Sequence, residues 1–227
     1  MLHPKTSFPC ATAAAPRRRA LRLIGGLLAG PVSFCAGAAR AQELAPDALV
    51  RSVVDKVIAA IKDDKAIQSG DLKRILEVAE NLVAPYFNFQ RMTRLAMGPN
   101  WKSATPPQQE DLVREFRSLL LRTYAVALKE YRNQVIDVRP VKLAAGQSDV
   151  QVKTVVAQPG AQAIPIDYDM EHVDRGWRVY DVTVGGVSLV INFRSSFDGE
   201  VRKSGVDGLI KSLAERNRSA GSGAAKK

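Results

Sequence analysis

Apolar residues recur every three to four positions over three stretches in the first half of the chain. This is the spacing of one face of a helix. We expect helices over 47–62, from Asp71 until Pro85 stops the second one, and over a shorter stretch that ends at Gly98. Each has a single apolar stripe, so these helices are predicted to pack on other elements rather than to stand alone.

The most specific local signal in the chain is a capping box at the start of a fourth helix. Thr105 fits the N-cap, Pro106 the first helical position, and Gln108 the residue that bonds back to the N-cap. A long apolar stripe follows this signal. We therefore expect this helix to be the longest and to end near Arg132.

The hydrophobic period then changes from 3.6 to 2, which is typical of half-buried strands. The alternation predicts strands over 135–143, 150–156, 164–171 and 180–184. Short turn sequences join them, so the strands should form a four-stranded antiparallel meander with one apolar face. Helical periodicity returns after Gly185 and Gly186, which we interpret as a turn leading into a helix. N-terminal helices, a meander and C-terminal helices define one α+β domain.

The first 41 residues have the composition of a secretory signal peptide. They contain six Lys and Arg residues and no acidic residue, and they include the apolar run 23–30. A small-x-small cleavage sequence closes the segment at 39–41. Residues 17–22 resemble a twin-arginine motif, so twin-arginine export and the general route both stay open. We divide the chain into a signal peptide (1–41), a single domain (42–217) and a disordered tail (218–227).

Removal of the signal peptide changes the charge of the chain. The whole sequence has a formal net charge of +10, which by itself would indicate nucleic acid or an anionic membrane as partner. After cleavage, 27 Lys and Arg residues face 23 Asp and Glu residues over 186 positions. The remaining basic residues are scattered and lack interleaved aromatic residues, so nucleic acid is not an expected partner. Both cysteines lie in the removed segment, which suits an oxidising periplasm.

The predicted mature chain has few groups that can perform catalysis. It has no cysteine, and one histidine, His172, cannot supply a structural zinc site. Alternation places Asp167, Asp169 and Glu171 on the face opposite the apolar residues, where they form a solvated acidic face. We therefore expect no enzyme, no catalytic residue, no metal and no cofactor. An exported hydrolase that uses His172 remains the competing hypothesis.

The most prominent feature of the predicted mature chain is its apolar surface. One face of the meander and several helical stripes can either fill a core or stand apart and leave a cavity for acyl chains. Burial of each methylene stabilises a bound lipid by about 0.8 kcal/mol, so such a cavity would need no catalytic group. Periodicity alone does not distinguish a filled core from a hollow one, and an interaction module without ligand also stays open.

Three groups of short motifs resemble one known family. The first group comprises residues 101–108, 116–120 and Tyr124. The second lies within 180–197 and includes Tyr180-Asp181-Val182 and Gly186-Val187-Ser188-Leu189-Val190. The third is the stretch 205–209. In order and spacing they are similar to the MlaC/Ttg2D (toluene tolerance) family, over about residues 45–216. The hopanoid-associated HpnM subfamily stays open as well.

The resemblance implies a function and a set of partners. It implies a periplasmic carrier, expected to be a monomer, that binds phospholipid as cargo and contributes to lipid asymmetry of the outer membrane. The implied partners are an MCE-domain protein of an inner-membrane ABC transporter and an outer-membrane lipoprotein–porin complex. The implied fold has a lipid pocket between sheet and helices. The predicted lipid-binding residues are Phe116, Tyr124, Val152, Ile166, Tyr168, Val182, Val187 and Leu189.

Overall fold

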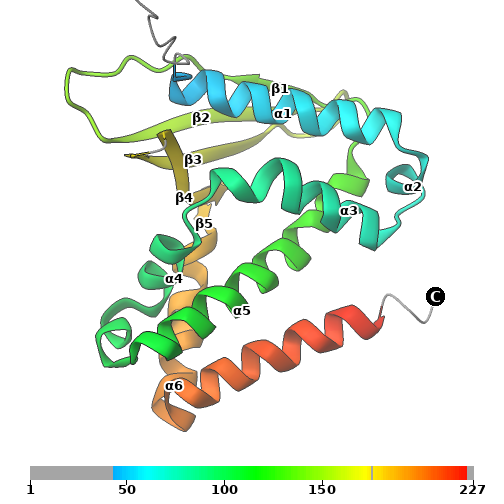
Figure 1. Ribbon diagram of the computed structural model, residues 1–227. Coiled ribbons are helices and arrows are strands. Elements are labelled where there is room, and N and C mark those ends of the chain that lie inside the picture. The colour runs from blue at the N-terminus through cyan, green and yellow to red at the C-terminus, as the bar shows by residue number, and fades with distance from the viewer. Residues whose placement is uncertain (1–42, 175, 224–227) are drawn as a thin grey trace, which may run out of the picture. The chain divides into compact units, whose positions relative to one another are not determined.

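The computed structural model describes residues 43–174 and 176–223 (Figure 1). The predicted signal peptide and the last four residues of the predicted tail lie outside this part. The first half contains α1 (Pro46–Asp63), α2 (Lys65–Gln68), α3 (Leu72–Val78), η1 (Ala79–Val83), η2 (Ala84–Tyr86), α4 (Phe89–Met97), η3 (Gly98–Ser103), α5 (Pro106–Ala125) and η4 (Val126–Glu130). The second half contains β1 (Val135–Val138), β2 (Asp149–Ala157), β3 (Ile164–Val173), β4 (Gly176–Val184), β5 (Val187–Ser188) and α6 (Leu189–Gly223). The α+β class predicted from the sequence is confirmed.

The capping box predicted at the start of α5 is present. The backbone N–H of Thr105 donates to Gln108 Oε1 over 2.9 Å, and the Gln108 N–H donates to Thr105 Oγ1 over 3.5 Å. Two otherwise unpaired backbone donors are thus satisfied at the start of the helix. Within the described chain α5 is the longest uninterrupted α-helix, and η4 continues it to Glu130, close to the predicted end at Arg132.

The sheet has one strand more than the four predicted. Its strands are antiparallel in the order β1-β2-β3-β4-β5, and β5 contributes only two residues. Gly185 and Gly186 have φ values of 58° and 86°, which suits the turn of a two-residue hairpin. The two glycines therefore reverse the chain into β5 before the helix begins, rather than leading directly into it.

An irregularity between β3 and β4 moves one residue away from the predicted apolar face. Asp169 pairs with Asp181, but Met170 pairs with Val179, so Tyr180 is the extra residue of a β-bulge. Strict alternation would place the side chains of Tyr180 and Val182 on the same face of the sheet. Instead, the Arg91 guanidinium lies 3.5 Å from the centroid of the Tyr180 ring. The bulge interrupts the period of 2 that the sequence prediction assumed.

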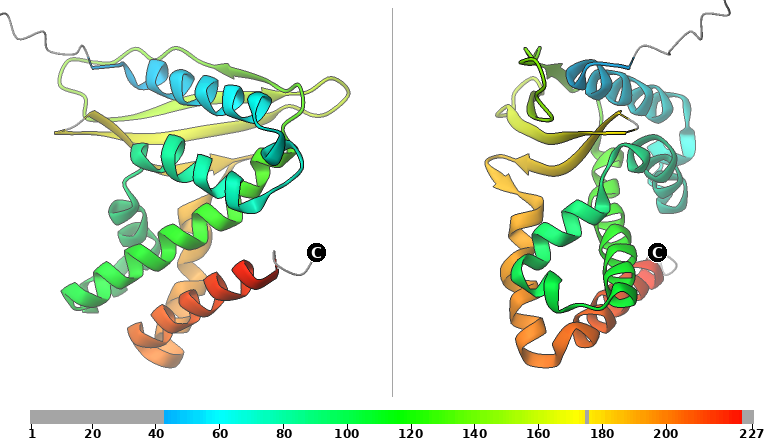
Figure 2. Two further views of the ribbon diagram at one scale, coloured as in Figure 1. Left: turned by 45° about the vertical axis from the view of Figure 1, so that its right-hand side comes forward. Right: turned by 60° about the vertical axis from the view of Figure 1, so that its left-hand side comes forward.

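The last helix changes direction at Gly205. This residue has φ 72° and ψ −178°, a conformation that favours glycine, and the two predicted apolar stripes lie on either side of it. The second segment packs beside α5, where the Asn217 side chain donates to the Glu115 carbonyl over 3.0 Å (Figure 2). Because α6 continues to Gly223, it extends six residues beyond the predicted domain end at 217.

The buried apolar residues form three clusters. The sheet cluster consists of Leu49, Val50, Val138, Val152, Met170, Trp177, Val179 and Val182. The corner cluster consists of Val57, Ile61, Ile67, Ile75, Val78, Ala79, Ala84, Leu121 and Ala125. The helix cluster consists of Met92, Ala96, Met97, Ala104, Leu112, Phe116, Leu120, Val190, Phe197, Leu209 and Leu213. Figures 1 and 2 show α1 lying along one face of the sheet and α5 extending away from it.

Candidate functional site

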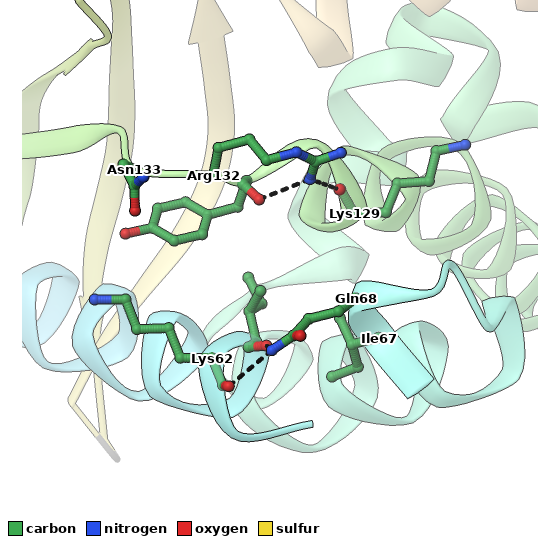
Figure 3. A pocket seen from close by; sticks show the side chains of 8 residues that line it. Lys62, Ile67, Gln68, Lys129, Arg132 and Asn133 are labelled. Atoms are coloured by element: carbon green, nitrogen blue, oxygen red, sulfur yellow. Dashed lines mark hydrogen bonds between the residues drawn. The ribbon is translucent and has the colours of Figure 1, made fainter. Parts of the chain in front are cut away.

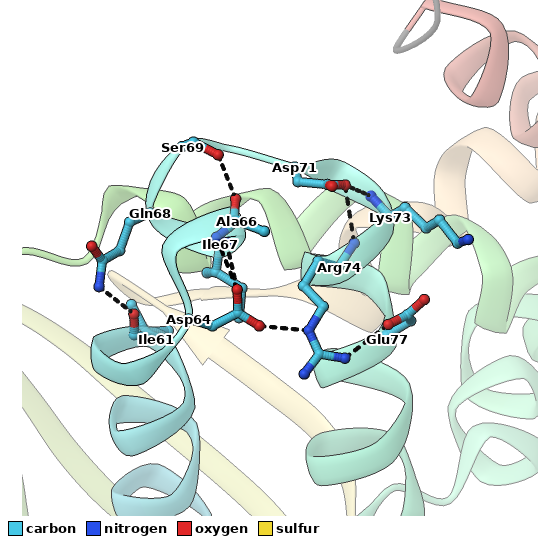
Figure 4. A network of polar contacts seen from close by, with 10 residues as sticks. All are labelled: Ile61, Asp64, Ala66, Ile67, Gln68, Ser69, Asp71, Lys73, Arg74 and Glu77. Carbon is cyan, nitrogen blue, oxygen red and sulfur yellow. Dashed lines mark hydrogen bonds and ion pairs between the residues drawn. The ribbon is translucent and has the colours of Figure 1, made fainter.

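A corner of the fold is built where α1 ends and the chain turns through α2 into α3 (Figure 4). The carboxylate of Asp64 accepts the backbone N–H of Ala66 over 2.9 Å and so caps α2. Arg74 Nε donates to Asp64 over 2.6 Å, and Arg74 Nη1 donates to Glu77 over 2.9 Å. These contacts connect the start of α2 to the first turns of α3.

The ion pair extends to lower pH the range over which Asp64 is charged. The hydrogen bond from Arg74 lowers the pKa of the Asp64 carboxyl below its ordinary value. A carboxylate with a lowered pKa in the folded state stabilises that state above its unfolded pKa of about 4 and loses the contribution as the pH falls. The corner is therefore expected to keep its geometry through the neutral range.

Gln68 fixes α2 against the end of α1. Its side-chain amide donates to the carbonyl of Ile61 over 3.1 Å and to the carbonyl of Lys62 over 2.8 Å. Both carbonyls belong to the last turn of α1, where backbone acceptors have no partner inside the helix. The side chain thus satisfies these acceptors and holds Ile67 beside Ile61.

A pocket of about 450 Å³ opens between this corner and the segment that follows η4 (Figure 3). This volume lies within the range of about 300–1,000 Å³ that is usual for small-molecule sites. The lining residues are Ile61, Lys62, Ile67, Gln68, Lys129, Tyr131, Arg132 and Asn133. They come from the end of α1, from α2, and from the chain between η4 and β1.

The lining is apolar at its floor and basic at its rim. Ile61 and Ile67 are buried members of the corner cluster, with 5% and 0% of their surface exposed. Lys62, Lys129 and Arg132 are exposed, and none of the eight lining residues is acidic. A floor of aliphatic side chains under a rim of cations suits an amphiphile whose polar end is anionic.

The apolar stripe of α1 connects the corner cluster, which includes Ile61 of the pocket, with the sheet cluster. Val57 and Ile61 belong to the corner cluster, while Leu49 and Val50 belong to the sheet cluster. Val53, one turn from each pair, packs against both clusters. Apolar side chains are therefore continuous from the pocket to the inner face of the sheet.

Five of the eight predicted lipid-binding residues meet on that inner face. Val152 and Val182 are buried in the sheet cluster, and Ile166, Tyr168 and Leu189 pack against it. Burial raises the pKa of the Tyr168 hydroxyl, and the side chain of Thr154 partly opposes this effect. These five residues come from β2, β3, β4 and the start of α6.

The other three predicted residues lie elsewhere. Phe116 is fully buried in the helix cluster, where its ring packs edge-on against Phe193 and Phe197 at centroid distances of 5.0 and 5.1 Å. Tyr124 is 37% exposed on the last turn of α5, and Val187 is 56% exposed in β5. The amphipathic pattern indicates burial, but it does not indicate which of several clusters receives each residue.

His172, the catalytic residue of the hydrolase alternative, lies at the surface. Its Nε2 lies 2.8 Å from a carboxylate oxygen of Glu43, and its ring packs edge-on against Trp177. No serine or threonine hydroxyl is bonded to its imidazole in the described ranges. The same ranges contain no group of three or more His, Cys, Asp and Glu side chains placed to hold a metal ion.

The acidic face predicted on β3 is tied into the fold. Glu171 accepts hydrogen bonds from Asn88 over 2.7 Å and from Arg91 over 2.6 Å. Asp169 accepts one from Gln151 over 3.0 Å. Burial raises the pKa of Asp169, and the neighbouring carboxylates of Asp181 and Asp167 add to the effect. The contacts of Glu171 attach α4 to the sheet.

The sequence patterns did not single out the cations of the pocket. Lys62 and Arg132 are far apart along the chain, and each lies at the expected end of a predicted helix, in an ordinary polar stretch. They line one pocket because α2 packs against both α1 and η4. The sequence feature nearest to the pocket is Tyr131, an aromatic residue between Lys129 and Arg132.

The fold and the pocket together define the class of this protein. It is an α+β domain in which helices pack against an antiparallel sheet, with a pocket of about 450 Å³ between the corner at α2 and the segment that follows η4. No helix in the described chain is both long and apolar enough to cross a membrane. The MlaC protein family model matches residues 51–215, so the chain belongs to the MlaC family.

Individual relatives agree with this assignment. The chain is 24% identical over 176 residues to the intermembrane phospholipid transport system binding protein MlaC of Haemophilus influenzae, covering 76% of this chain and 82% of that protein. It is 24% identical over 163 residues to the toluene tolerance protein ttg2D of Pseudomonas putida, covering 71% and 75%. A phospholipid-binding protein from Ralstonia solanacearum, solved in complex with a phospholipid, matches with a TM-score of 0.71 and 37% identity, covering 77% of this chain and 98% of that one.

Proposed function

We propose that this chain is a non-enzymatic periplasmic carrier of phospholipids. It would accept lipid from, or deliver it to, an MCE-domain protein of an inner-membrane ABC transporter and an outer-membrane lipoprotein–porin complex. The observation that carries the proposal is the similarity to the Ralstonia solanacearum protein, which holds a phospholipid and is matched over nearly its whole length. The name of the Haemophilus influenzae relative supports the transport role.

The apolar side chains on the inner face of the sheet support this function physically. A carrier must replace water around acyl chains with aliphatic side chains, and each buried methylene contributes about 0.8 kcal/mol. The sheet cluster and the corner cluster, joined at Val53, offer such side chains over several elements. The signal peptide predicted over 1–41 supports the periplasmic location.

Extraction of the purified protein tests the proposal. The whole gene should be expressed, and the protein purified from the cell envelope fraction without detergent. We expect phospholipid in the solvent extract at a near-stoichiometric ratio to protein, and exchange of that lipid with vesicles. The proposal fails if no lipid is recovered and none can be loaded from vesicles. Recovery of hopanoid alone would assign the chain to the alternative cargo.

The His172→Ala variant separates a carrier from a hydrolase. The side chain is exposed and its partner Glu43 is also exposed, so we expect the free energy of unfolding to change by less than about 1 kcal/mol. Lipid loading and vesicle exchange should equal those of the wild type. A loss of function in a folded His172→Ala variant would contradict the non-enzymatic proposal. Lys203→Ala, on the exposed surface of α6, is a suitable control.

A further inference from the structure

One end of the sheet carries exposed apolar side chains. Ile164, the first residue of β3, is 48% exposed, and Val187 of β5 is 56% exposed. Ile166 pairs with Val184, which in turn pairs with Val187, so these three side chains lie on one face of the sheet. Ile164 precedes Ile166 by two residues on the same strand and therefore lies on that face as well. Ile164, Ile166, Val184 and Val187 together form an apolar tip.

The apolar tip is the outer end of the inner face of the sheet. Ile166 and Val184 are partly buried and pack against the sheet cluster, whereas Ile164 and Val187 are exposed. Along β3 the exposed fraction on this face rises from 0% at Met170 to 48% at Ile164. The side chains on this face of β3 are therefore apolar from the core to the solvent-exposed end of the strand.

The two turns at this end of the sheet contain no charged residue. Residues 154–166 lead from β2 into β3, and residues 182–193 lead from β4 through β5 into α6; neither stretch contains Asp, Glu, Lys or Arg. The Gly185 N–H donates to the carbonyl of Pro165 over 2.9 Å, which holds the two turns side by side. Because 25% of the whole chain is charged, the absence of charge is a property of this end. The tip can enter an apolar medium without burying a charged side chain.

A third segment adds a single cation at the same end. Residues 131–136 lead into β1 and contain one charged residue, Arg132. The backbone N–H of Arg132 donates to Gln134 Oε1 over 2.6 Å, and Gln134 Nε2 donates to Gln158 Oε1 in the β2–β3 turn over 3.1 Å. The Arg132 side chain is exposed and has no ion pair within the described chain. Its positive charge is therefore available to an anionic surface.

We propose that the apolar tip docks on the surface of an anionic phospholipid bilayer, with Ile164 and Val187 inserted among the lipids and Arg132 near the phosphates. This inference goes beyond the proposed function, because it assigns the carrier a direct contact with membrane lipid. Binding to a bilayer interface increases with the apolar area buried and with the attraction of cations to anionic lipids. An uncharged tip offers no ion pairs that would specify a protein partner, which favours a lipid surface as the occupant.

Ile164→Asp tests the apolar part of the surface, and Val135→Asp is its matched control. Val135 is the first residue of β1 and is 64% exposed. Ile136 pairs with Val156, which pairs with Ile164, so Val135 points to the opposite face at the same end of the sheet. Flotation measures binding to vesicles of equal parts phosphatidylglycerol and phosphatidylcholine. We expect Ile164→Asp to bind about tenfold more weakly than the wild type, and Val135→Asp to bind like the wild type. Equal binding by the two variants would overturn the docking site.

Arg132→Gln tests the electrostatic part, with Arg94→Gln on the exposed surface of α4 as the control. We expect Arg132→Gln to bind the same vesicles about fivefold more weakly, because one cation near an anionic bilayer contributes about that factor. Binding to vesicles of phosphatidylcholine alone should not change. A loss that is equally large on both kinds of vesicle, or equal in the two variants, would overturn the role of Arg132.

A fluorescent label measures insertion directly. Ala161 and Ala144 are both exposed and lie in the β2–β3 and β1–β2 connections, at opposite ends of the sheet. Each is replaced by Cys in turn and labelled with an environment-sensitive dye, and mass spectrometry verifies a single label. We expect the emission to shift to the blue on vesicles at position 161 and to stay unchanged at 144. The same response at both positions would overturn insertion of the tip, whether or not Ile164→Asp folds.

The docking surface and the carrier function fail in different ways. A wild-type protein that co-purifies with phospholipid but does not bind vesicles would overturn the docking surface and leave the carrier function standing. Vesicle binding that depends on Ile164, by a protein that carries no lipid, would support the docking surface and overturn the carrier function. A wild-type dimer that Ile164→Asp dissociates, without vesicle binding, would identify a second copy as the occupant and overturn the bilayer. Thermal melting establishes that the variants fold.

Discussion

Replacement of Val182 by Trp is expected to remove most of the bound phospholipid while the protein stays folded. Val182 is 7% exposed, lies in the sheet cluster and pairs with Tyr168 on the neighbouring strand. An indole at this position would occupy the space between sheet and helices that acyl chains would need. Overpacking a buried site costs about 1–3 kcal/mol, which most domains of this size tolerate. The measurement is the lipid-to-protein ratio after equilibration with vesicles, alongside thermal melting.

The neighbouring residue offers a matched control for this experiment. Thr183 follows Val182 on β4, so its side chain points to the opposite face of the sheet. Thr183→Trp adds the same indole to the same strand and should leave lipid loading near the wild-type level. Equal loading in folded Val182→Trp and wild-type proteins would mean that Val182 does not line the lipid site. The predicted lipid-binding role of the sheet's inner face would then be wrong.

Asp181→Ala is expected to destabilise the fold by about 2–4 kcal/mol, because it removes a buried acceptor with several partners. The Asp181 carboxylate accepts the backbone N–H of Val182 over 2.7 Å and that of Val190 over 3.2 Å, and also the Ser188 hydroxyl. Both N–H groups are buried and would lose their partner. The variant would also loosen the junction at which β4 and β5 meet the start of α6.

Urea-induced unfolding measures this effect. Asp181→Asn should fall between the wild type and Asp181→Ala, since an amide keeps one oxygen acceptor. Asp167→Ala is the control, because Asp167 lies on the adjacent strand and its side chain has no recorded hydrogen bond in the described chain. We expect Asp167→Ala to change the free energy of unfolding by less than about 0.5 kcal/mol. A decrease in the free energy of unfolding of less than about 1 kcal/mol for Asp181→Ala would contradict the stabilising role of its buried hydrogen bonds.

Asp181 also illustrates the limit of reading alternation along a strand. The period of 2 places it on the polar face, opposite Val182 and Val184, and so indicates exposure. In the structure it is 7% exposed, because α6 packs over the end of β4 and brings Val190 to its carboxylate. The two faces of a strand follow from local sequence, but burial of the polar face depends on a helix that comes later in the chain.

The predicted lipid-binding residues show the same difference between what local sequence specifies and what later packing decides. Val152, Ile166, Tyr168 and Val182 gather on one apolar surface, because alternation along three strands specifies a common face, and Leu189 at the start of α6 packs against it. Phe116 has an equally clear apolar pattern but lies in the helix cluster. A helical stripe specifies that a side chain is buried, not which partner buries it. Which of the eight residues contact lipid stays a prediction.

The sequence by itself determined the class of fold, the order of its elements, the capped start of α5 and the family to which the chain belongs. The capped helix start and the element types depend on hydrogen bonds and periodicities within a few residues, and the family resemblance depends on the order and spacing of short motifs. Only the tertiary structure decided the bulge at Tyr180, the burial of Asp181 and the placement of Lys62 and Arg132 at one pocket. Each depends on contacts between segments far apart in the chain, whose geometry is set by the packing of whole helices and strands.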